Sequence, residues 1–285
     1  MTETEKNRVE GGTLYLVATP IGNLSDLSSR AVKILTEVDF LCAEDTRVTS
    51  KLLSSLGITK SMVPYHDNNR HEKGPYIVRR LLEGESCALV SDAGTPAVSD
   101  PGEDLVRDCI EAGVPVTSVP GACAAITALT LSGMNTRRFA FEGFLEGRVS
   151  DRKAALERIR TDIRTQIFYE APHRLTDTLA LFSEVLGDDR RIALCRELTK
   201  LNEEVLRMTV GEAAAYYAEN EPRGEYVVVV EGYTAKASEQ FWAEMTVEEH
   251  VAYYMEKAEM KKMDAIKAAA KDRGVSKSDL YKQLL

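Results

Sequence analysis

Short apolar runs alternate with helix-like segments throughout the first half of the chain. The runs have the length and the β-branched, apolar content of buried strands, and we predict strands at residues 13–19, 40–43, 62–65, 87–91 and 116–119. Apolar residues at helical spacing follow each run and predict helices at residues 27–38, 46–56, 75–82, 103–111 and 124–131. Ser25 or Asp26 is the expected cap of the first helix. Strands and helices that alternate in this way build a parallel, doubly wound α/β sheet.

The second half has a different pattern, with strands predicted at residues 139–144, 165–169, 192–195, 204–208 and 226–231. A charged loop at 146–153 leads to one helix, and further helices are predicted at 172–186 and 210–218. Some connections are short enough to join antiparallel neighbours, so we expect a mixed sheet. The boundary between the two α/β parts is expected near residues 132–138.

The tail becomes polar and strand-free, then helical, with helices predicted at residues 247–255, 261–271 and 279–285. Ser276 or Ser278 is the expected cap of the last helix, and the glycine-containing turn before it resembles helix-turn-helix geometry or belongs to a small helical bundle. The predicted organisation is therefore a flexible start (1–11), an N-terminal parallel α/β domain (12–133), a second α/β domain (134–234) and a helical C-terminal extension (235–285).

The formal net charge of −9 argues against a protein that coats nucleic acid without preference, because Lys and Arg contacts to phosphate supply most of that affinity. Basic residues still cluster at 137–138, at 148 with 152–153, and at 190–191. Each cluster is either a local RNA-contacting surface or a solvated rim.

The five cysteines are widely spaced, and no C-x-x-C pair occurs, as is typical of reduced core thiols in a cytosolic protein. The polar start lacks the apolar core of a signal peptide, and no apolar run approaches the roughly 18–20 residues that span a bilayer. We therefore expect a cytoplasmic protein with no membrane partner.

Three loops rich in Gly and Pro follow predicted strands of the first half, at residues 19–23, 92–102 and 120–124. Because the carboxyl ends of parallel strands share one edge of a sheet, we expect these loops to converge on one ligand. The middle loop is much longer than the roughly 2–6 residues usual for such a connection. Neither a G-x-G-x-x-G fingerprint nor a G-x-x-x-x-G-K-[ST] phosphate loop is present, which favours a compact ligand with few phosphates.

Six ordered motifs resemble the tetrapyrrole methylase superfamily and, within it, the ribosomal RNA small subunit methyltransferase I family. The motifs are ATPIGNL (18–24), AEDTR (43–47), SDAGTPAVSDPG (91–102), VPGA (119–122), YEAPHR (169–174) and CRELTK (195–200). The match runs from about residue 12 to residue 233, and the helical tail is similar to the C-terminal extension of that family.

The resemblance implies S-adenosylmethionine (SAM) as cofactor, bound in a cleft between two α/β domains, in a homodimer. It also implies methyl transfer to the ribose 2′-hydroxyl of a decoding-centre cytidine in 16S rRNA, with small-subunit rRNA or the 30S subunit as partner. The cofactor contacts carried over from the motifs are Pro20, Asp92, Gly94, Thr95, Val98, Cys123, Ala124, Tyr169 and Ala171. Cys123 stands where Ser or Thr is common in related members, and a thiol donates only weak hydrogen bonds.

Charged segments at the expected mouth of this cleft supply the catalytic candidates. A ribose hydroxyl is a poor nucleophile while protonated, and a positioned base or cation would accelerate its reaction by roughly 10²–10⁴-fold. The candidates are Glu44, Asp45, Arg47, Glu170, His173 and Arg174. The structural alternatives are a helix cap at Asp45 or Thr46 and ordinary ion pairing within residues 170–174.

The candidates for RNA contact are polar and basic side chains outside the three loops that are rich in Gly and Pro. These are His66, Asn69, Arg70, Arg138, Arg148, Arg196 and Lys200. The residues His66, Asp67, His71 and Glu72 lack an established zinc spacing, so we predict no metal, and their segment is either an RNA-contacting or a solvated loop. His250 lies on a predicted helix that looks exposed, and it is expected to be structural. The alternative functions are a tetrapyrrole methyltransferase, which shares the cofactor, and a noncatalytic nucleic-acid-binding regulator that uses the tail.

Overall fold

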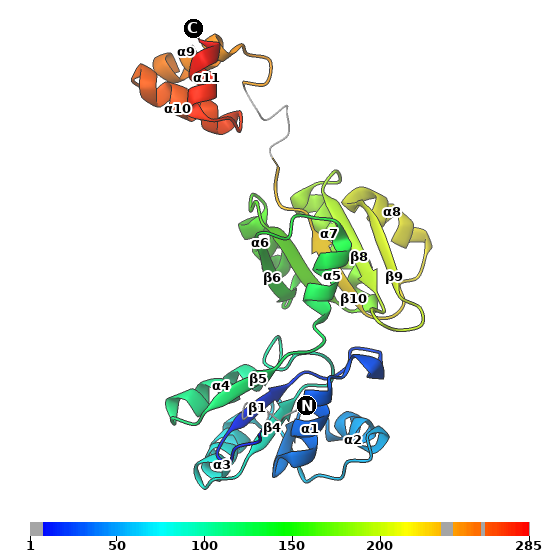
Figure 1. The fold of residues 1–285 in the computed structure, drawn as a ribbon. Coiled ribbons are helices and arrows are strands. Elements are labelled where there is room, and N and C mark those ends of the chain that lie inside the picture. The colour runs from blue at the N-terminus through cyan, green and yellow to red at the C-terminus, as the bar shows by residue number, and fades with distance from the viewer. Residues whose placement is uncertain (1–7, 235–241, 258–259, 285) are drawn as a thin grey trace. The chain divides into compact units, whose positions relative to one another are not determined.

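The computed structural model describes residues 8–234, 242–257 and 260–284. Residues 1–7 of the predicted flexible start and residues 235–241 of the predicted extension lie outside the described residues. The chain forms two compact units, Met1–Tyr233 and Thr234–Leu285. The first unit contains two sheets, and the second is helical (Figure 1).

The first sheet is parallel throughout, with strand order β3-β2-β4-β1-β5, and so confirms the predicted parallel α/β architecture. Its strands are β1 (Leu14–Val17), β2 (Phe40–Ala43), β3 (Met62–Pro64), β4 (Cys87–Val90) and β5 (Val116–Val119). The helices of this part are α1 (Ser29–Glu37), α2 (Thr46–Ser55), α3 (Arg70–Leu82), α4 (Gly102–Glu111) and α5 (Ala124–Ser132).

Strand β2 shows why these runs are apolar without alternation. Leu41 and Ala43 belong to one hydrophobic cluster together with residues of α1, and Phe40 and Cys42 belong to another together with residues of α3 and α4. Helices therefore cover both faces of the strand, and every side chain of β2 is buried. Complete burial of one such side chain contributes about 1.5–3 kcal/mol, so both clusters hold the central strands firmly in place.

The second sheet is mixed, as predicted, with strand order β6-β7-β10-β8-β9. Strands β6 and β7 are parallel, whereas β10 is antiparallel to both of its neighbours, and β8 is antiparallel to β9. The strands are β6 (Phe139–Phe144), β7 (Thr165–Glu170), β8 (Arg191–Arg196), β9 (Glu204–Thr209) and β10 (Tyr226–Val230). The helices that follow in this part are α6 (Val149–Ile159), α7 (Pro172–Leu186) and α8 (Val210–Glu219).

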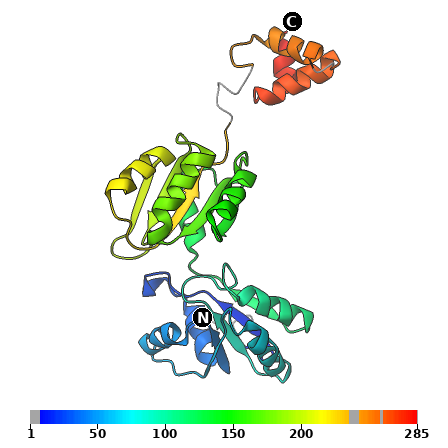
Figure 2. The same cartoon turned by 180° about the vertical axis from the view of Figure 1, so that it is seen from behind.

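Helix α5 covers one face of the second sheet although the sequence assigns it to the first α/β part. Its residues Ala125, Ala128 and Leu129 share a hydrophobic cluster with Ile167 of β7 and Val229 of β10. Helices α6, α7 and α8 pack against the opposite face, as the view from behind shows (Figure 2). Both sheets therefore belong to one compact unit, and α5 connects them.

Two helices of the first part begin at other residues than predicted. Ser28, rather than Ser25 or Asp26, caps α1, because its hydroxyl accepts a hydrogen bond from the Ala31 amide, while residues 24–26 form a short 3₁₀ turn (η2, Leu24–Asp26). Helix α3 begins five residues before Pro75, so that this proline lies inside the helix. A proline there lacks an amide hydrogen, and the helix accommodates it in its second turn.

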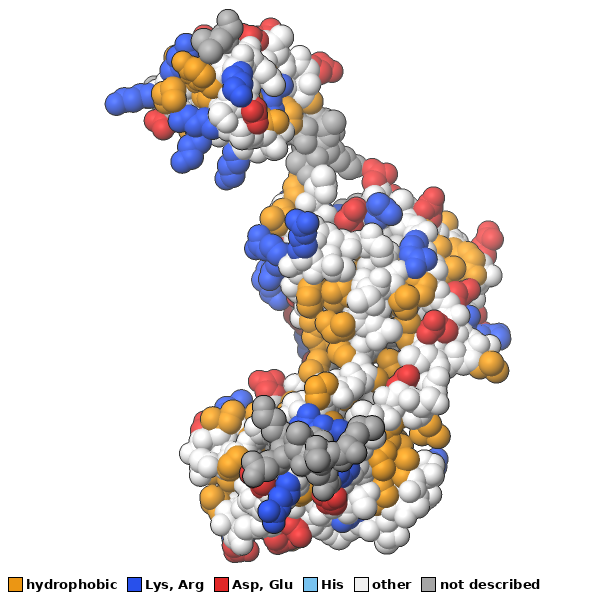
Figure 3. Space-filling view, viewed as in Figure 1, with side chains coloured by type: hydrophobic (Ala, Val, Ile, Leu, Met, Phe, Trp, Pro, Cys, Tyr) orange, Lys and Arg blue, Asp and Glu red, His pale blue; other side chains and the backbone are white. Residues whose placement is uncertain are grey.

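The second unit contains α9 (Val247–Lys257), α10 (Lys262–Asp272) and α11 (Lys277–Gln283), and Ser276 caps α11 as one of the two predicted residues. His250 is fully buried rather than exposed, because α9 turns it inward, and its Nδ1 accepts a hydrogen bond from Arg273 at 3.1 Å. Lys and Arg side chains are prominent on this unit (Figure 3). Among the described residues, no helix combines the length and apolar content needed to cross a bilayer.

Candidate functional site

The three loops at the carboxyl edge of the first sheet are hydrogen-bonded to one another. Thr19 and Gly94 exchange two backbone hydrogen bonds, of 2.9 and 3.1 Å, which join the loop after β1 to the loop after β4. The Thr95 hydroxyl donates to the Ala122 carbonyl at 2.9 Å and joins the second loop to the loop after β5. The predicted convergence of the loops is therefore confirmed, and the loop after β4 lies at its centre.

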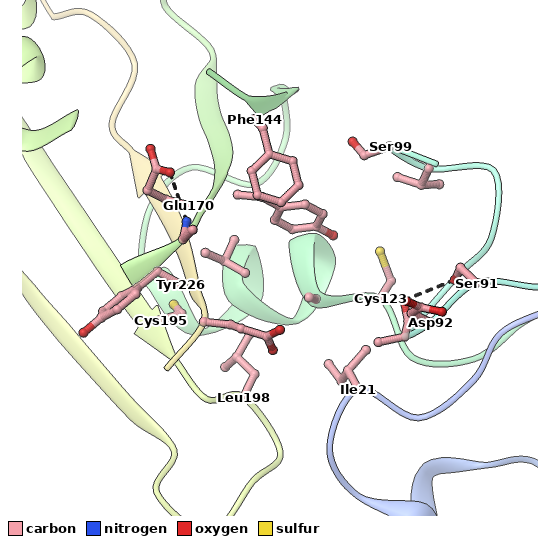
Figure 4. Close-up of a pocket in the computed structure, with 18 of the residues that line it drawn as sticks. Ile21, Ser91, Asp92, Ser99, Cys123, Phe144, Glu170, Cys195, Leu198 and Tyr226 are labelled. Atoms are coloured by element: carbon pink, nitrogen blue, oxygen red, sulfur yellow. Dashed lines mark hydrogen bonds between the residues drawn. The ribbon is translucent and has the colours of Figure 1, made fainter. Parts of the chain in front are cut away.

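A cavity of about 490 Å³ opens between these loops and the second sheet. Figure 4 shows Ile21, Asp92 and Ser99 from the first part on one side and Glu170 and Leu198 from the second part on the other. Further lining residues are Glu44, Ser91, Ala93, Gly94, Thr95, Val98, Asp100, Cys123, Ala124, Phe144, Tyr169, Ala171, Pro172, Cys195, Glu197, Lys200, Glu225, Tyr226 and Val227.

Strained backbone is concentrated in two loops at this cavity. Among the described residues other than glycine, positive φ angles occur at Ala97, Ser99, Glu197 and Thr199, with values from 50° to 66°. Such conformations persist only where the surroundings fix them, and they are typical of functional sites. In the loop after β4 the fixing group is the carboxylate of Asp100, which accepts hydrogen bonds from the amides of Ala97, Val98 and Gly102.

The loop after β8 carries an ion-pair cluster at the cavity. The Lys200 ammonium lies 2.9 Å from carboxylate oxygens of both Glu197 and Glu225. The hydrogen bond from Lys200 and the bond from the Glu225 backbone lower the pKa of Glu197, so its carboxylate stays ionised. The same loop approaches the loop after β1 closely, because a Cβ built on Gly22 would lie 2.4 Å from Lys200 Cγ.

Glu44 is the half-buried carboxylate that the first sheet presents to the cavity. Burial raises its pKa, and the neighbouring carboxylates of Asp92 and Asp100 raise it further. Its neighbour Asp45 has another task, since the Asp45 carboxylate accepts a hydrogen bond from the Arg47 amide and caps α2. Asp45 and the exposed Arg47 guanidinium also form an ion pair at 2.6 Å. Of this charged segment, Glu44 is thus the residue that lines the cavity.

Glu170 reaches the cavity wall, but its carboxylate is held by neighbouring groups. One oxygen accepts from the Ala171 amide at 3.0 Å and lies 3.7 Å from Arg174 Nε, and the other accepts from the Thr178 hydroxyl. Thr178 in turn accepts a hydrogen bond from the buried Arg152. A carboxylate with these partners holds the start of α7 and this part of the cavity wall in place.

Aromatic rings and small residues complete the wall formed by the second sheet. Tyr169 packs edge-on against Phe141 and Phe144, with ring centroids 4.9 and 5.5 Å apart. Burial raises the pKa of Tyr169 to about 12, so its hydroxyl stays protonated. Cys123 forms the N-cap of α5 without a side-chain capping hydrogen bond, and this end of the helix lies at the cavity.

A comparison with known protein families matches most of the part of the chain that contains both sheets. The model of the tetrapyrrole (corrin/porphyrin) methylases matches residues 13–214. The chain belongs to the tetrapyrrole methylase family. Several curated relatives carry the name ribosomal RNA small subunit methyltransferase I. The relative from Halalkalibacterium halodurans is 46% identical over 98% of this chain and 96% of its own length. The relative from Bacillus subtilis is 46% identical over 95% of this chain and 93% of its own length. The relative from Escherichia coli O157:H7 is 45% identical over 96% of this chain and 95% of its own length.

Solved structures of other proteins share the fold of this methylase. Diphthine synthase aligns with a TM-score of 0.61 at 14% identity, over 80% of this chain and 92% of its own. Uroporphyrin-III-C-methyltransferase from Thermus thermophilus aligns with a TM-score of 0.54 at 20% identity, over 76% of this chain and 94% of its own. At such identities the likeness shows the fold alone.

Most residues that the methylase resemblance implies for the cofactor lie together. The residues that line the cavity are Asp92, Gly94, Thr95, Val98, Cys123, Ala124, Tyr169 and Ala171. Pro20 instead lines a neighbouring hollow behind Ser91 and Asp92. Two neighbouring residues of the loop after β1 therefore line different spaces. Ile21 lines the cavity, and Pro20 lines the neighbouring hollow.

The predicted RNA-contacting residues are more scattered. Lys200 lines the cavity, whereas Arg196 pairs with Glu204 at 3.1 Å beside a separate hollow. Arg70 pairs with Asp104 at 2.8 Å, and His66 and Asn69 lie in the turn before α3. The remaining members, Arg138 and Arg148, are exposed, as is the catalytic candidate His173.

Two expectations about charged segments need revision. Arg152, taken from the sequence as part of a basic surface cluster, is 6% exposed because α6 turns it toward Thr178 of α7. His71 and Glu72 belong to the first turn of α3 rather than to a loop. Within the described ranges, no group of three or more His, Cys, Asp or Glu side chains is arranged as a metal site.

Sequence reasoning missed several cavity residues from the second sheet. Phe144 stands at the end of β6 and Leu198 follows β8, so a search restricted to strand ends would have found both. Glu225 and Val227 carry no such signal, because they come to the cavity only through the antiparallel pairing of β10 with β7 and β8.

Proposed function

We propose that this chain is a SAM-dependent rRNA methyltransferase that methylates the ribose 2′-hydroxyl of a cytidine in the decoding centre of 16S rRNA. The observation that carries the proposal is the cavity of about 490 Å³ where three strand-end loops meet the second sheet, in a chain whose relatives over nearly its full length are small-subunit rRNA methyltransferases. The volume falls within the roughly 300–1,000 Å³ that is typical of cofactor sites.

The charges of the cavity support a positively charged donor. Its lining contains the carboxylates Glu44, Asp92, Asp100, Glu170, Glu197 and Glu225. Among the described residues Lys200 is the cation of the lining, and Glu197 and Glu225 already pair with it. An excess of carboxylates attracts a sulfonium and an ammonium group and repels the phosphates of a dinucleotide or a nucleoside triphosphate.

The remaining parts of the lining also suit SAM. Ile21, Leu198 and Val227 supply apolar surface for the adenine ring, and Tyr169 supplies an aromatic one. The amides at the start of α5 can receive the donor's carboxylate, since the N-cap residue Cys123 makes no side-chain capping bond there.

When bound, SAM supplies a methyl group on a positively charged sulfur, which departs as a neutral thioether. The chain's own residues must hold the acceptor oxygen in line with that methyl group, and positioning of this kind can contribute about 7–11 kcal/mol in favourable cases. The hydroxyl proton must also leave as the new C–O bond forms. We assign its removal to Glu44, because the raised pKa of this carboxylate makes it a better base than an ordinary glutamate.

Small-subunit rRNA is the acceptor that we favour over a tetrapyrrole ring because the relatives named for rRNA cover nearly the whole chain. The solved tetrapyrrole enzyme is similar only at the level of the fold. This proposal includes activity in the cytoplasm, where ribosomal subunits are assembled, and the homodimer that the family resemblance implies, which light scattering would test.

The test uses tritiated SAM with 30S subunits, or naked rRNA, from a strain that lacks the enzyme. We expect label on a ribose of the decoding-centre region and none with Glu44→Gln, while calorimetry still detects SAM binding to that variant. Label on a base, or label on a corrinoid precursor but not on rRNA, would contradict the acceptor assignment. If calorimetry detects no SAM binding to the wild-type protein, the proposal is wrong, and the noncatalytic nucleic-acid-binding regulator becomes the favoured function.

A further inference from the structure

A second hollow, of about 320 Å³, lies beside the cavity and shares two lining residues with it. The shared residues are Ser91 and Asp92, which directly follow β4, so the two spaces adjoin at these residues. The other lining residues are Thr19, Pro20, Gly22, Leu24, Val48, Thr49, Lys51, Leu52 and Ser55. The hollow is thus built from the loop after β1 and from one side of α2.

The apolar part of this hollow comes from both elements. Pro20 and Leu24 belong to the loop, and Val48 and Leu52 belong to the helix. Leu24 is 57% exposed and Val48 is 40% exposed, so a flat apolar group that enters the hollow would remove both side chains from water. A nucleobase has two such faces and is small enough to enter a hollow of about 320 Å³.

The polar part of the hollow suits the sugar and phosphate of a nucleotide. Lys51 lines the hollow and lies one helical turn after Arg47, so the two exposed cations stand on the same side of α2. Cations in this arrangement contact phosphate oxygens. The Asp92 carboxylate accepts a hydrogen bond from the Asp45 amide at 3.0 Å, which fixes this shared residue next to Glu44.

We propose that this hollow receives the base of the acceptor nucleoside, turned out of the rRNA, with its ribose reaching past Ser91 and Asp92 to the cavity that Glu44 lines and its 5′ or 3′ phosphate near Lys51. The inference rests on the proposed function and specifies where its substrate lies. An enzyme that modifies a nucleotide within folded RNA must bring that nucleotide out of its stack, and an apolar hollow next to the reacting groups is where such a base is held.

Two neighbouring serines of α2 provide the test. Ser55 lines the hollow and Ser54 does not, yet both are exposed and both donate their hydroxyls to carbonyls of the same helix. Ser55→Trp is expected to fill the hollow and raise the KM for 30S subunits by about tenfold or more, with the Kd for SAM unchanged. Ser54→Trp, which adds the same bulk outside the hollow, is expected to retain the wild-type KM and Kd.

Lys51→Glu is the second variant, because it changes an exposed side chain without adding bulk to the hollow. It is expected to raise the KM for the RNA substrate and to reduce the salt dependence of binding by about one phosphate contact. A wild-type KM for both Ser55→Trp and Lys51→Glu overturns the inference, even if the wild-type enzyme methylates rRNA. If the wild-type enzyme does not methylate rRNA at all, the proposed function itself fails, so the two failures are distinct.

Discussion

Gly94 stands at the cavity wall with a φ angle of +82°, a conformation that other residues adopt only with strain. A Cβ atom at this position would lie 3.1 Å from Ile21 Cγ2 and 3.5 Å from the Ala122 carbonyl oxygen. Gly94→Ala therefore has two effects. It introduces left-handed strain of about 1–2 kcal/mol, and it displaces the Ile21 side chain from the cavity wall.

Gly113→Ala separates these two effects. Gly113 has a φ angle of +75°, and a Cβ there would meet nothing within 4 Å, so this variant introduces the strain without the displacement. Both variants are expected to lose about 1–2 kcal/mol of stability, which lowers the Tm of a protein of this size by roughly 2–8 °C. Only Gly94→Ala is expected to weaken SAM binding, by about tenfold or ~1.4 kcal/mol. Gly94→Trp fills the space and is expected to abolish binding.

Thermal melting and calorimetric titration with SAM measure the two quantities independently. Equal SAM affinities in the wild type, Gly94→Ala and Gly94→Trp would refute the assignment of this loop to the cofactor wall. An equal loss of affinity in Gly113→Ala would show instead that reduced stability, rather than the shape of the cavity, determines binding.

Three further changes test other parts of the site. Asp100→Ala removes the carboxylate that holds three backbone amides of the loop after β4, and we expect a loss of about 1–3 kcal/mol in thermal or urea unfolding together with weaker SAM binding in calorimetry. Thr178→Val removes the buried hydroxyl that donates to Glu170, and we expect the free energy of unfolding in urea to fall by about 1–3 kcal/mol. The control is Thr130→Val at an exposed position, which should change the free energy of unfolding little. Because the pKa of Glu44 is raised above 4.5, the native state binds more protons than the unfolded state, and stability falls as the pH rises from about 4.5 through the raised pKa. Glu44→Gln should therefore be more stable than the wild type above that range, lose this advantage below it, and transfer no methyl group; a wild-type pH dependence of unfolding in this variant would contradict the assignment.

The strands of the first sheet could be predicted from the sequence because burial on both faces leaves a local signal. Phe40 through Ala43 are all apolar, since helices cover each side of β2, and the glycines and prolines of the following loops mark where the strands end. Helix starts were less predictable. The prediction for the cap of α1 was Ser25 or Asp26, whereas the structure has Ser28. Several Ser and Asp residues in this segment are equally suitable as caps, and tertiary packing selects one of them.

The cavity residues from the loop after β4 were also accessible to sequence reasoning, whereas the surroundings of the charged residues were not. Asp92, Gly94 and Thr95 lie in a motif that follows a strand, and parallel pairing brings such motifs to one edge. Glu44 and Glu170 look alike in sequence, as acidic residues after apolar strands. The structure surrounds Glu170 with donors and leaves Glu44 facing the cavity with a raised pKa.

The sequence by itself therefore determined the order of the elements, the parallel first sheet and the loops at its carboxyl edge, because burial and turn geometry depend on neighbouring residues. Tertiary structure decided that α5 covers the second sheet, that Gly22 meets the loop containing Lys200, and that Arg152 is buried. These outcomes depend on contacts between residues far apart in the chain. Such contacts determine how exposed a side chain is and which charged groups surround it. A local sequence pattern does not contain this information.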